Sequence, residues 1–183
     1  MTDRDMNDTP DLEGTWRLAT PGDIPFLYEL VTLVDPRWWR FSRHGLEPSA
    51  VFSLVQTISA GAIVLDATGR AVAAAALADS GATGTGTFEY FARPDEPSQS
   101  LARRFAPEIV AAAFAGAPVR RLYRERFDGD ADVYGVVNEW FETEVVFPTY
   151  ALVDGRHESR TIDVLTAARF AEVHAAFIAR GAP

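Results

Sequence analysis

The sequence contains no cysteine and only three histidines among its 183 residues. The absence of cysteine excludes disulfides, thiolate metal sites and a cysteine nucleophile together. The histidines are scattered, and no carboxylates cluster at ligand spacing, so we predict that the protein has no metal site. The sequence also lacks a nucleophilic-serine elbow and a phosphate-binding P-loop.

Long apolar runs and an excess of positive charge are missing as well. No run approaches the ~18 apolar residues of a membrane-spanning helix, and 17 Lys and Arg stand against 26 Asp and Glu, a net charge of −9. A surface this acidic repels nucleic acid and anionic membranes. The polar start of the chain has no signal-peptide core. We therefore expect a cytoplasmic protein that binds neither nucleic acid nor membrane.

The composition fits one folded domain. The chain is 48% hydrophobic and 11% aromatic, which is enough for one sizeable core and short for two domains. Residues 1–13 are rich in carboxylates and have little to bury, so we predict a disordered tail over 1–13 and a single domain over 14–183.

Hydrophobic periodicity predicts alternating strands and helices. A strand over 15–19 precedes Thr20-Pro-Gly-Asp23, which has the pattern of a capping box, and a helix to about Leu33. The remaining predicted elements are helices over 48–58, from the 90s to 114, 131–140 and 167–180, strands over 60–66, 71–78, 87–93 and 119–127, and a hairpin after 141. Asp154-Gly155 is a strong signal for the turn of that hairpin.

The stretch 92–114 reads as the end of a strand, a short loop and a long Ala-rich helix. Pro94, Leu101, Ala102 and Phe114 match, without a gap, the frame of the central segment of the GNAT N-acetyltransferase superfamily, V-x-P-x-x-R/Q-G-x-G-x-A. The opening strand and T-P-x-D helix and the final D-G-R hairpin resemble the family too. This resemblance covers about residues 15–180. It implies an α/β (α+β) fold: a mixed, mostly antiparallel, splayed sheet of six to seven strands with helices on both faces.

The resemblance also implies an acyl-CoA cofactor, acetyl-CoA or another. In the family, loop N–H groups and the helix N-terminus hold its pyrophosphate. Here the basic residue of the motif falls on Pro97 and its two glycines on Ser98 and Ser100, so we expect CoA to bind weakly or not at all. Pro107, inside the helix, is a further departure. The candidate cofactor-binding residues are Phe91, Ala92, Arg93, Ser98, Gln99, Ser100, Leu101, Ala102 and Arg103.

Acyl transfer needs a base for the amine and an acid for the thiolate. Glu89, in the central strand, is the candidate base, and an ion pair with a neighbouring-strand arginine such as Arg124 is the equally weighted alternative. Family members often carry a tyrosine as the acid on the fourth helix. Val136 falls at that place, and Tyr134 lies half a turn away, so Tyr134 can replace it only if the helix is rotated.

An aromatic and basic segment follows the first helix. It resembles the W-R-F segment of a group of GNAT-like actinobacterial proteins, and the resemblance implies a wall of the acceptor site. The alternative is that its aromatic residues cap the core while its arginines are solvated. The candidate substrate-binding residues are Trp38, Trp39, Arg40, Phe41, Arg43 and His44.

Three functions stay open. The first is an N-acyltransferase that moves a small acyl group from a thioester to an amine. The second is a GNAT-fold protein that has lost CoA binding and serves as a binding or accessory partner. The third keeps the cleft but acts on a hydrophobic metabolite without CoA. The expected partner is an amine or another small molecule, and a homodimer is possible.

Overall fold

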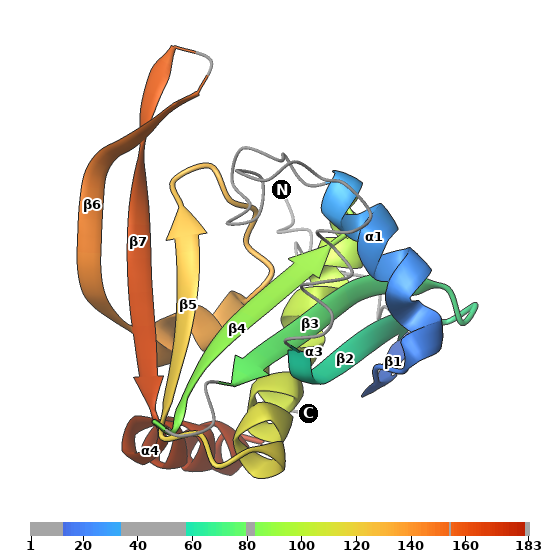
Figure 1. Cartoon of the computed structure of the whole chain (residues 1–183). Coiled ribbons are helices and arrows are strands. Elements are labelled where there is room, and N and C mark those ends of the chain that lie inside the picture. The colour runs from blue at the N-terminus through green and yellow to red at the C-terminus, as the bar shows by residue number, and fades with distance from the viewer. Residues whose placement is uncertain (1–12, 34–57, 80–82, 154, 182–183) are drawn as a thin grey trace, which may run out of the picture.

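The computed structural model describes residues 13–33, 58–79, 83–153 and 155–181, which are organised around one seven-stranded sheet (Figure 1). The described elements are β1 Gly14–Leu18, η1 Pro21–Asp23, α1 Ile24–Leu33, β2 Ile58–Asp66, β3 Ala71–Asp79, β4 Thr85–Ala92, α3 Glu96–Gly116, β5 Arg121–Phe127, η3 Gly135–Trp140, β6 Glu142–Val153, β7 Arg156–Thr166 and α4 Ala167–Ala179. The strands lie in the order β1-β2-β3-β4-β5-β7-β6.

The sheet divides at its single parallel pair. Strands β1 to β4 form an antiparallel meander, and β5, β7 and β6 form a second antiparallel group. β4 and β5 pair in parallel only where 85–87 lie against 121–123, and beyond this point the two strands diverge (Figure 1). The predicted mixed, mostly antiparallel, splayed sheet is therefore confirmed.

Helices cover both faces of the meander, as predicted. Successive residues of a strand point to opposite faces. Ile63 and Ala74 pack against Leu30 of α1, while their neighbours Val64 and Ala73 belong to the main core, to which α3 contributes. In Figure 1, α1 lies in front of the sheet and α3 behind it.

The alanine-rich strand is confirmed against its helical propensity. β3 has the sequence AVAAAALAD, and alanine is the best helix former. The strand pairs with β2 on one side and β4 on the other, and it contacts both α1 and α3. Tertiary pairing therefore outweighs propensity, and the small side chains let a helix approach on each face.

The predicted capping box begins the first helix. The backbone N–H of Thr20 donates to Asp23 Oδ2 at 2.7 Å, and the N–H of Asp23 donates to the Thr20 carbonyl at 2.9 Å. Arg17 adds an ion pair to the Asp23 carboxylate at 2.6 Å. The hydrogen bond from Arg17 lowers the pKa of Asp23, so this turn is held by an ionised carboxylate.

The predicted helix over 131–140 is wrong. Residues 131–134 are irregular, and only the six-residue 3₁₀-helix η3 follows. The carboxylate of Asp132 accepts the N–H groups of Tyr134 and Gly135 at 3.0 and 2.9 Å, and Gly135 has a φ of 54°. These side-chain bonds compete with helix formation. The predicted helix over 48–58 lies outside the described residues, except that Ile58 begins β2.

Within the described part of the chain, no helix is long and apolar enough to cross a membrane.

Candidate functional site

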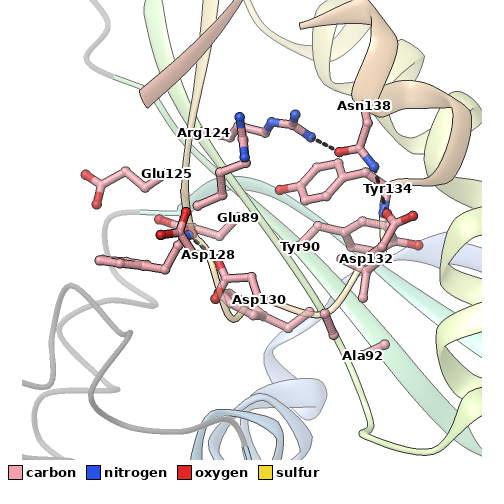
Figure 2. Close-up of a pocket in the computed structure, with 15 residues that line it drawn as sticks. Glu89, Tyr90, Ala92, Arg124, Glu125, Asp128, Asp130, Asp132, Tyr134 and Asn138 are labelled. Atoms are coloured by element: carbon pink, nitrogen blue, oxygen red, sulfur yellow. Dashed lines mark hydrogen bonds between the residues drawn. The ribbon is translucent and has the colours of Figure 1, made fainter. Parts of the chain in front are cut away.

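A cleft of about 550 Å³ opens where β4 and β5 diverge (Figure 2). Its walls come from the second half of each strand and from the segment that leads from β5 into η3. The described lining residues are Glu89, Tyr90, Phe91, Ala92, Arg124, Glu125, Arg126, Phe127, Asp128, Asp130, Ala131, Asp132, Val133, Tyr134 and Asn138.

The cleft brings together the two predicted catalytic residues, Glu89 and Tyr134. Along β4, Phe88 and Tyr90 are buried in the core on the α3 side, so the intervening Glu89 points to the α1 side. Tyr134 packs against the core on the α3 side. Its pKa is influenced by the charge of Glu89. The cleft thus receives one candidate group from each face of the sheet.

Aromatic rings hold Tyr134 in place. Its ring meets Phe88, Tyr90 and Phe141 edge-on, with centroids 6.2, 5.8 and 6.2 Å away, and the Arg124 guanidinium lies 4.6 Å from its centroid. Burial raises the pKa of the phenol, although the positive charge of Arg124 opposes the rise. Tyr134 therefore keeps its proton at neutral pH.

Arg124 is a buried cation at the floor of the cleft. Only 3% of the residue is exposed. Its Nε donates to Asp163 Oδ2 at 3.1 Å, its Nη1 donates to Asn138 at 2.7 Å, and Phe141 lies 4.3 Å from the guanidinium carbon. Arg124 is thus paired with Asp163 and Asn138, and the ion pair of Glu89 with a neighbouring-strand arginine stays a prediction.

Asp163 accepts hydrogen bonds from two arginines of β5, Arg124 and Arg126. Arg126 Nε donates to the same carboxylate at 2.7 Å, and Thr143 donates to its other oxygen at 2.8 Å. Burial alone would raise the pKa of Asp163, but the hydrogen bonds of Arg126 and Thr143 and the charge of Arg124 outweigh it and lower the pKa. The single charge of Asp163 is therefore shared by both arginines of the cleft.

A polar chain continues from Arg124 along the wall. Asn138 accepts from Arg124 and donates to Asp132 Oδ1 at 2.7 Å, and both bonds are visible in Figure 2. The same oxygen of Asp132 holds the backbone of Tyr134. Burial would raise the pKa of Asp132, but its bonds to Gly135, Asn138 and Tyr134 lower it. This series of hydrogen bonds connects the backbone of Tyr134 to the buried ion pair of Arg124 and Asp163.

The mouth of the cleft is acidic. Asp128 Oδ2 accepts the Ser159 N–H, and Asp130 Oδ2 accepts the Phe127 N–H. Desolvation, with smaller contributions from the charges of Glu158 and Asp128, raises the pKa of Asp130 to about 6. Among the described lining residues, five carboxylates face two arginines. Glu125 is paired with Arg160, and the remaining four carboxylates still outnumber the two arginines, so the lining carries a net negative charge.

The predicted cofactor loop is part of a helix in the structure. α3 begins at Glu96, and its N-cap is Asp95, whose Oδ1 accepts the Ser98 N–H at 3.0 Å. Pro97 and Ser98 therefore lie in the first turn. Ser98 is 2% exposed. The helix continues through Pro107 to Gly116 without a break.

Polar side chains around this turn bond to one another. Glu96 accepts hydrogen bonds from Ser100 Oγ and from Arg103, and Arg103 Nη1 donates to the Asp132 carbonyl at 3.0 Å. Gln99 donates to the Pro94 carbonyl at 3.2 Å.

These residues do not fit the pyrophosphate of CoA. A helix N-terminus binds an anion through free N–H groups in its first turn. Here Pro97 has no N–H, and the N–H of Ser98 is taken by Asp95. Asp95 and Glu96 add two negative charges at the position where the two negatively charged phosphates of the pyrophosphate would have to bind.

The other predicted cofactor residues are placed as follows. Arg93 Nε donates to the Ala71 carbonyl, and its two Nη atoms bind Glu29 of α1 at 2.7 and 3.1 Å. Leu101 and Ala102 are buried in the main core. Phe91 packs with the α1 cluster, and Ala92 lies in the core; both also line the cleft. Their role toward a cofactor stays a prediction.

The predicted acceptor wall over 38–44 lies outside the described residues. The sequence reasoning missed Asp130, Asp132 and Asn138 as lining residues. The signal available for the two aspartates is the run Asp128-Gly-Asp-Ala-Asp132, which places three carboxylates within five residues. Among the described residues, no group of three or more His, Asp or Glu is arranged to hold a metal ion.

A scan against protein-family models finds no match, and neither does a search of curated proteins. Solved structures do match. The spermidine/spermine N-acetyltransferase SpeG from Vibrio cholerae is similar with a TM-score of 0.66 and 13% identity, over 88% of this chain and 96% of that one. A protein described as a proposed phosphinothricin N-acetyltransferase is similar with a TM-score of 0.64 and 13% identity, over 84% and 98%.

Proposed function

Because the chain has the GNAT fold, we propose that it is an N-acyltransferase that binds a protonated amine in the cleft between β4 and β5. The observation that carries this proposal is the cleft itself. It joins a carboxylate, Glu89, and a protonated phenol, Tyr134, in an acidic cavity at the divergence of the strands.

The charge of the cleft supports an amine as the acceptor. Its described carboxylates outnumber its arginines, and both Arg124 and Arg126 are bound to Asp163. A cleft lined by one sign of charge concentrates ligands of the opposite sign. A cation is therefore attracted, and a carboxylate ligand is repelled. Amines are also what the similar spermidine acetyltransferase is named for.

The two candidate groups suit acid–base work on an amine. A bound ammonium must lose a proton before it can attack, and Glu89 supplies a carboxylate to take it. The nitrogen then takes the acyl group from a thioester: a C–N bond forms, the C–S bond breaks, and the thiol leaves with a proton. Tyr134, whose pKa is raised by burial, holds a proton at neutral pH and can donate a hydrogen bond or a proton inside the cleft.

A second function is favoured by one specific observation. The first turn of α3 is capped by Asp95 and carries Glu96, so nothing there anchors a nucleotide. On this reading the protein binds the amine without transferring an acyl group to it, as a GNAT-fold binding or accessory protein.

Calorimetry with matched probes tests the proposal. Spermidine and butylamine should bind the full chain, and butanol, which has the size of butylamine but no charge, should not. Release of thiol from S-acetyl-N-acetylcysteamine or acetyl-CoA should depend on the amine. Amine binding without thiol release would support the binding protein. Failure of both amines to bind would refute the proposed acceptor.

A further inference from the structure

We infer that Asp95 and Glu96 close the N-terminal turn of α3 to the pyrophosphate of an acyl-CoA, so that any thioester used by the cleft is held without its nucleotide. This inference rests on the proposed function only in one respect, namely that the cleft uses a thioester. The closure of the turn stands on its own geometry.

The first step of the argument concerns the donors. In the first turn, Pro97 lacks an N–H, the N–H of Ser98 donates to Asp95 Oδ1 at 3.0 Å, and that of Gln99 donates to the Asp95 carbonyl at 3.1 Å. The positive end of the helix is thus occupied by the chain's own carboxylate. An anion would have to displace Asp95 before it could reach these groups.

The second step concerns the side chains that might replace those donors. Ser100 Oγ and the Arg103 guanidinium both bond to Glu96, and the side-chain amide of Gln99 donates to the Pro94 carbonyl. Hydrogen bonds from Ser100 and Arg103 lower the pKa of Glu96, and those from Ser98 lower the pKa of Asp95 although burial opposes them. Both carboxylates are therefore ionised at neutral pH.

The third step concerns space along the helix. The segment before η3 lies directly on the second turn of α3, because Arg103 Nη1 donates to the Asp132 carbonyl at 3.0 Å and a Cβ on Gly135 would lie 3.1 Å from Arg103 Cβ. On the sheet side, Tyr90 donates its hydroxyl to the Ala102 carbonyl at 2.7 Å. The chain thus contacts the second turn of α3 from both sides, while the cleft lined by Glu89 stays open.

The experiment measures binding of inorganic pyrophosphate and of CoA by calorimetry. We expect no saturation of the wild-type protein by either probe at about 1 mM. The double variant Asp95→Asn with Glu96→Gln keeps a cap and the shapes of both side chains but removes both charges. It should bind pyrophosphate at least about tenfold more tightly.

Two controls are needed. One distinguishes an effect of net charge from an effect at this site, and the other distinguishes a loss of folding from a change in binding. Glu142→Gln with Glu144→Gln removes the same net charge from exposed positions of β6 and should leave pyrophosphate binding at the wild-type level. The single variant Glu96→Gln, which retains the N-cap, serves if the double variant melts early, and it should bind pyrophosphate more tightly than wild type.

Micromolar binding of CoA or pyrophosphate by the wild-type protein would overturn the inference. So would variants of Asp95 and Glu96 that fold but gain no affinity. Amine binding tests the proposed function separately. Asp95 and Glu96 lie outside the described lining of the cleft, so their variants should bind butylamine as the wild-type protein does.

Discussion

At the scale of single residues, Arg124 explains why the cleft has its present shape. It is a buried cation whose contacts come from β7, η3 and the rings of Tyr134 and Phe141. A buried charge is tolerated only when it is paired and hydrogen-bonded. Loss of Asp163 or Asn138 as a partner of Arg124 should therefore also disturb Tyr134, the candidate acid.

Replacing the partner of this cation should destabilise the protein strongly. Asp163→Asn removes the negative charge that faces both Arg124 and Arg126. Uncompensated buried charges cost about 3–5 kcal/mol, and urea unfolding should show a loss of that order. Glu142→Gln, at an exposed position of β6, should change the free energy of unfolding little. A loss for Asp163→Asn no larger than for this control would mean that the buried network contributes nothing to stability.

Glu89 should matter for the ligand more than for stability. Glu89→Gln keeps the shape and removes the charge, so turnover should fall at least about tenfold and amine binding should weaken. If Glu89 acts on the ligand, the melting temperature should stay close to that of wild type. Unchanged turnover and amine affinity with an early melt would instead assign Glu89 a structural role.

Asp130 should make stability depend on pH in the acid range. Desolvation raises its folded pKa to about 6 from the ordinary value of 3.8, the hydrogen bond from Phe127 and the charge of Arg126 oppose the rise, and the charges of Glu158 and Asp128 add to it. Below pH ~4 the group is protonated in both folded and unfolded states, and it has no effect. As the pH rises from ~4 to 6, the unfolded chain loses its proton first, so folding becomes less favourable, and the cost is complete above about 6.

Asp130→Asn should therefore be more stable than wild type at pH 7.5 and equal to it near pH 3.5. Asn can still accept the N–H of Phe127. Because Asp130 is exposed to solvent, screening limits the gain to about 1 kcal/mol or less. Thermal melts at the two pH values check this expectation, and a variant less stable than wild type at pH 7.5 would contradict it.

At the scale of elements, the junction of the strands sets the site. Gly86 lies where β4 pairs with both β3 and β5. A Cβ there would lie 2.7 Å from Leu77 Cδ1 and 3.3 Å from Val119 Cγ2. The missing side chain of Gly86 leaves room on the face of the sheet for the side chains of Leu77 and Val119, and β4 and β5 diverge directly beyond this pairing.

Gly86→Ala should therefore strain the junction. Overpacking of this kind costs about 1–3 kcal/mol, which chemical denaturation can measure. Gly69→Ala is not a suitable control, because Gly69 has a φ of 81°, whereas Gly116→Ala adds a methyl group where no atom lies within 4 Å. A Gly86→Ala protein as stable as the Gly116→Ala protein would show that the junction has room.

Periodicity predicted the elements well where one face packs against the core, as in β4 and α4. It failed over 131–140, because the backbone N–H groups of Tyr134 and Gly135 donate to the Asp132 carboxylate and override the helical pattern. It also could not predict that Arg124 and Asp163 meet, since that depends on the register of β5 against β7. The sequence identified Glu89 and Tyr134 as candidates, but it did not identify the polar lining residues Asp130, Asp132 and Asn138.

At the scale of the whole molecule, the net charge and the charge of the cleft lining have the same sign. The chain carries a net charge of −9, and the cleft concentrates negative groups at the divergence of the strands. An acidic molecule attracts cations over a distance of about 10 Å at moderate salt. We therefore expect amines to associate with it faster than neutral ligands of the same size.

The three-residue parallel pairing between β4 and β5 also has a consequence for how the chain acquires its structure. Strands β1 to β4 largely pair with sequence neighbours, whereas β5 must wait for β7, since Arg121 pairs with Thr166. Contacts distant in sequence form slowly. During refolding, pulse-labelled amide exchange should protect the amides of β2 and β3 before those of β5, and the cleft should appear last, when the second half of the sheet docks. Simultaneous protection of all strands would show instead that the two halves fold as one cooperative unit.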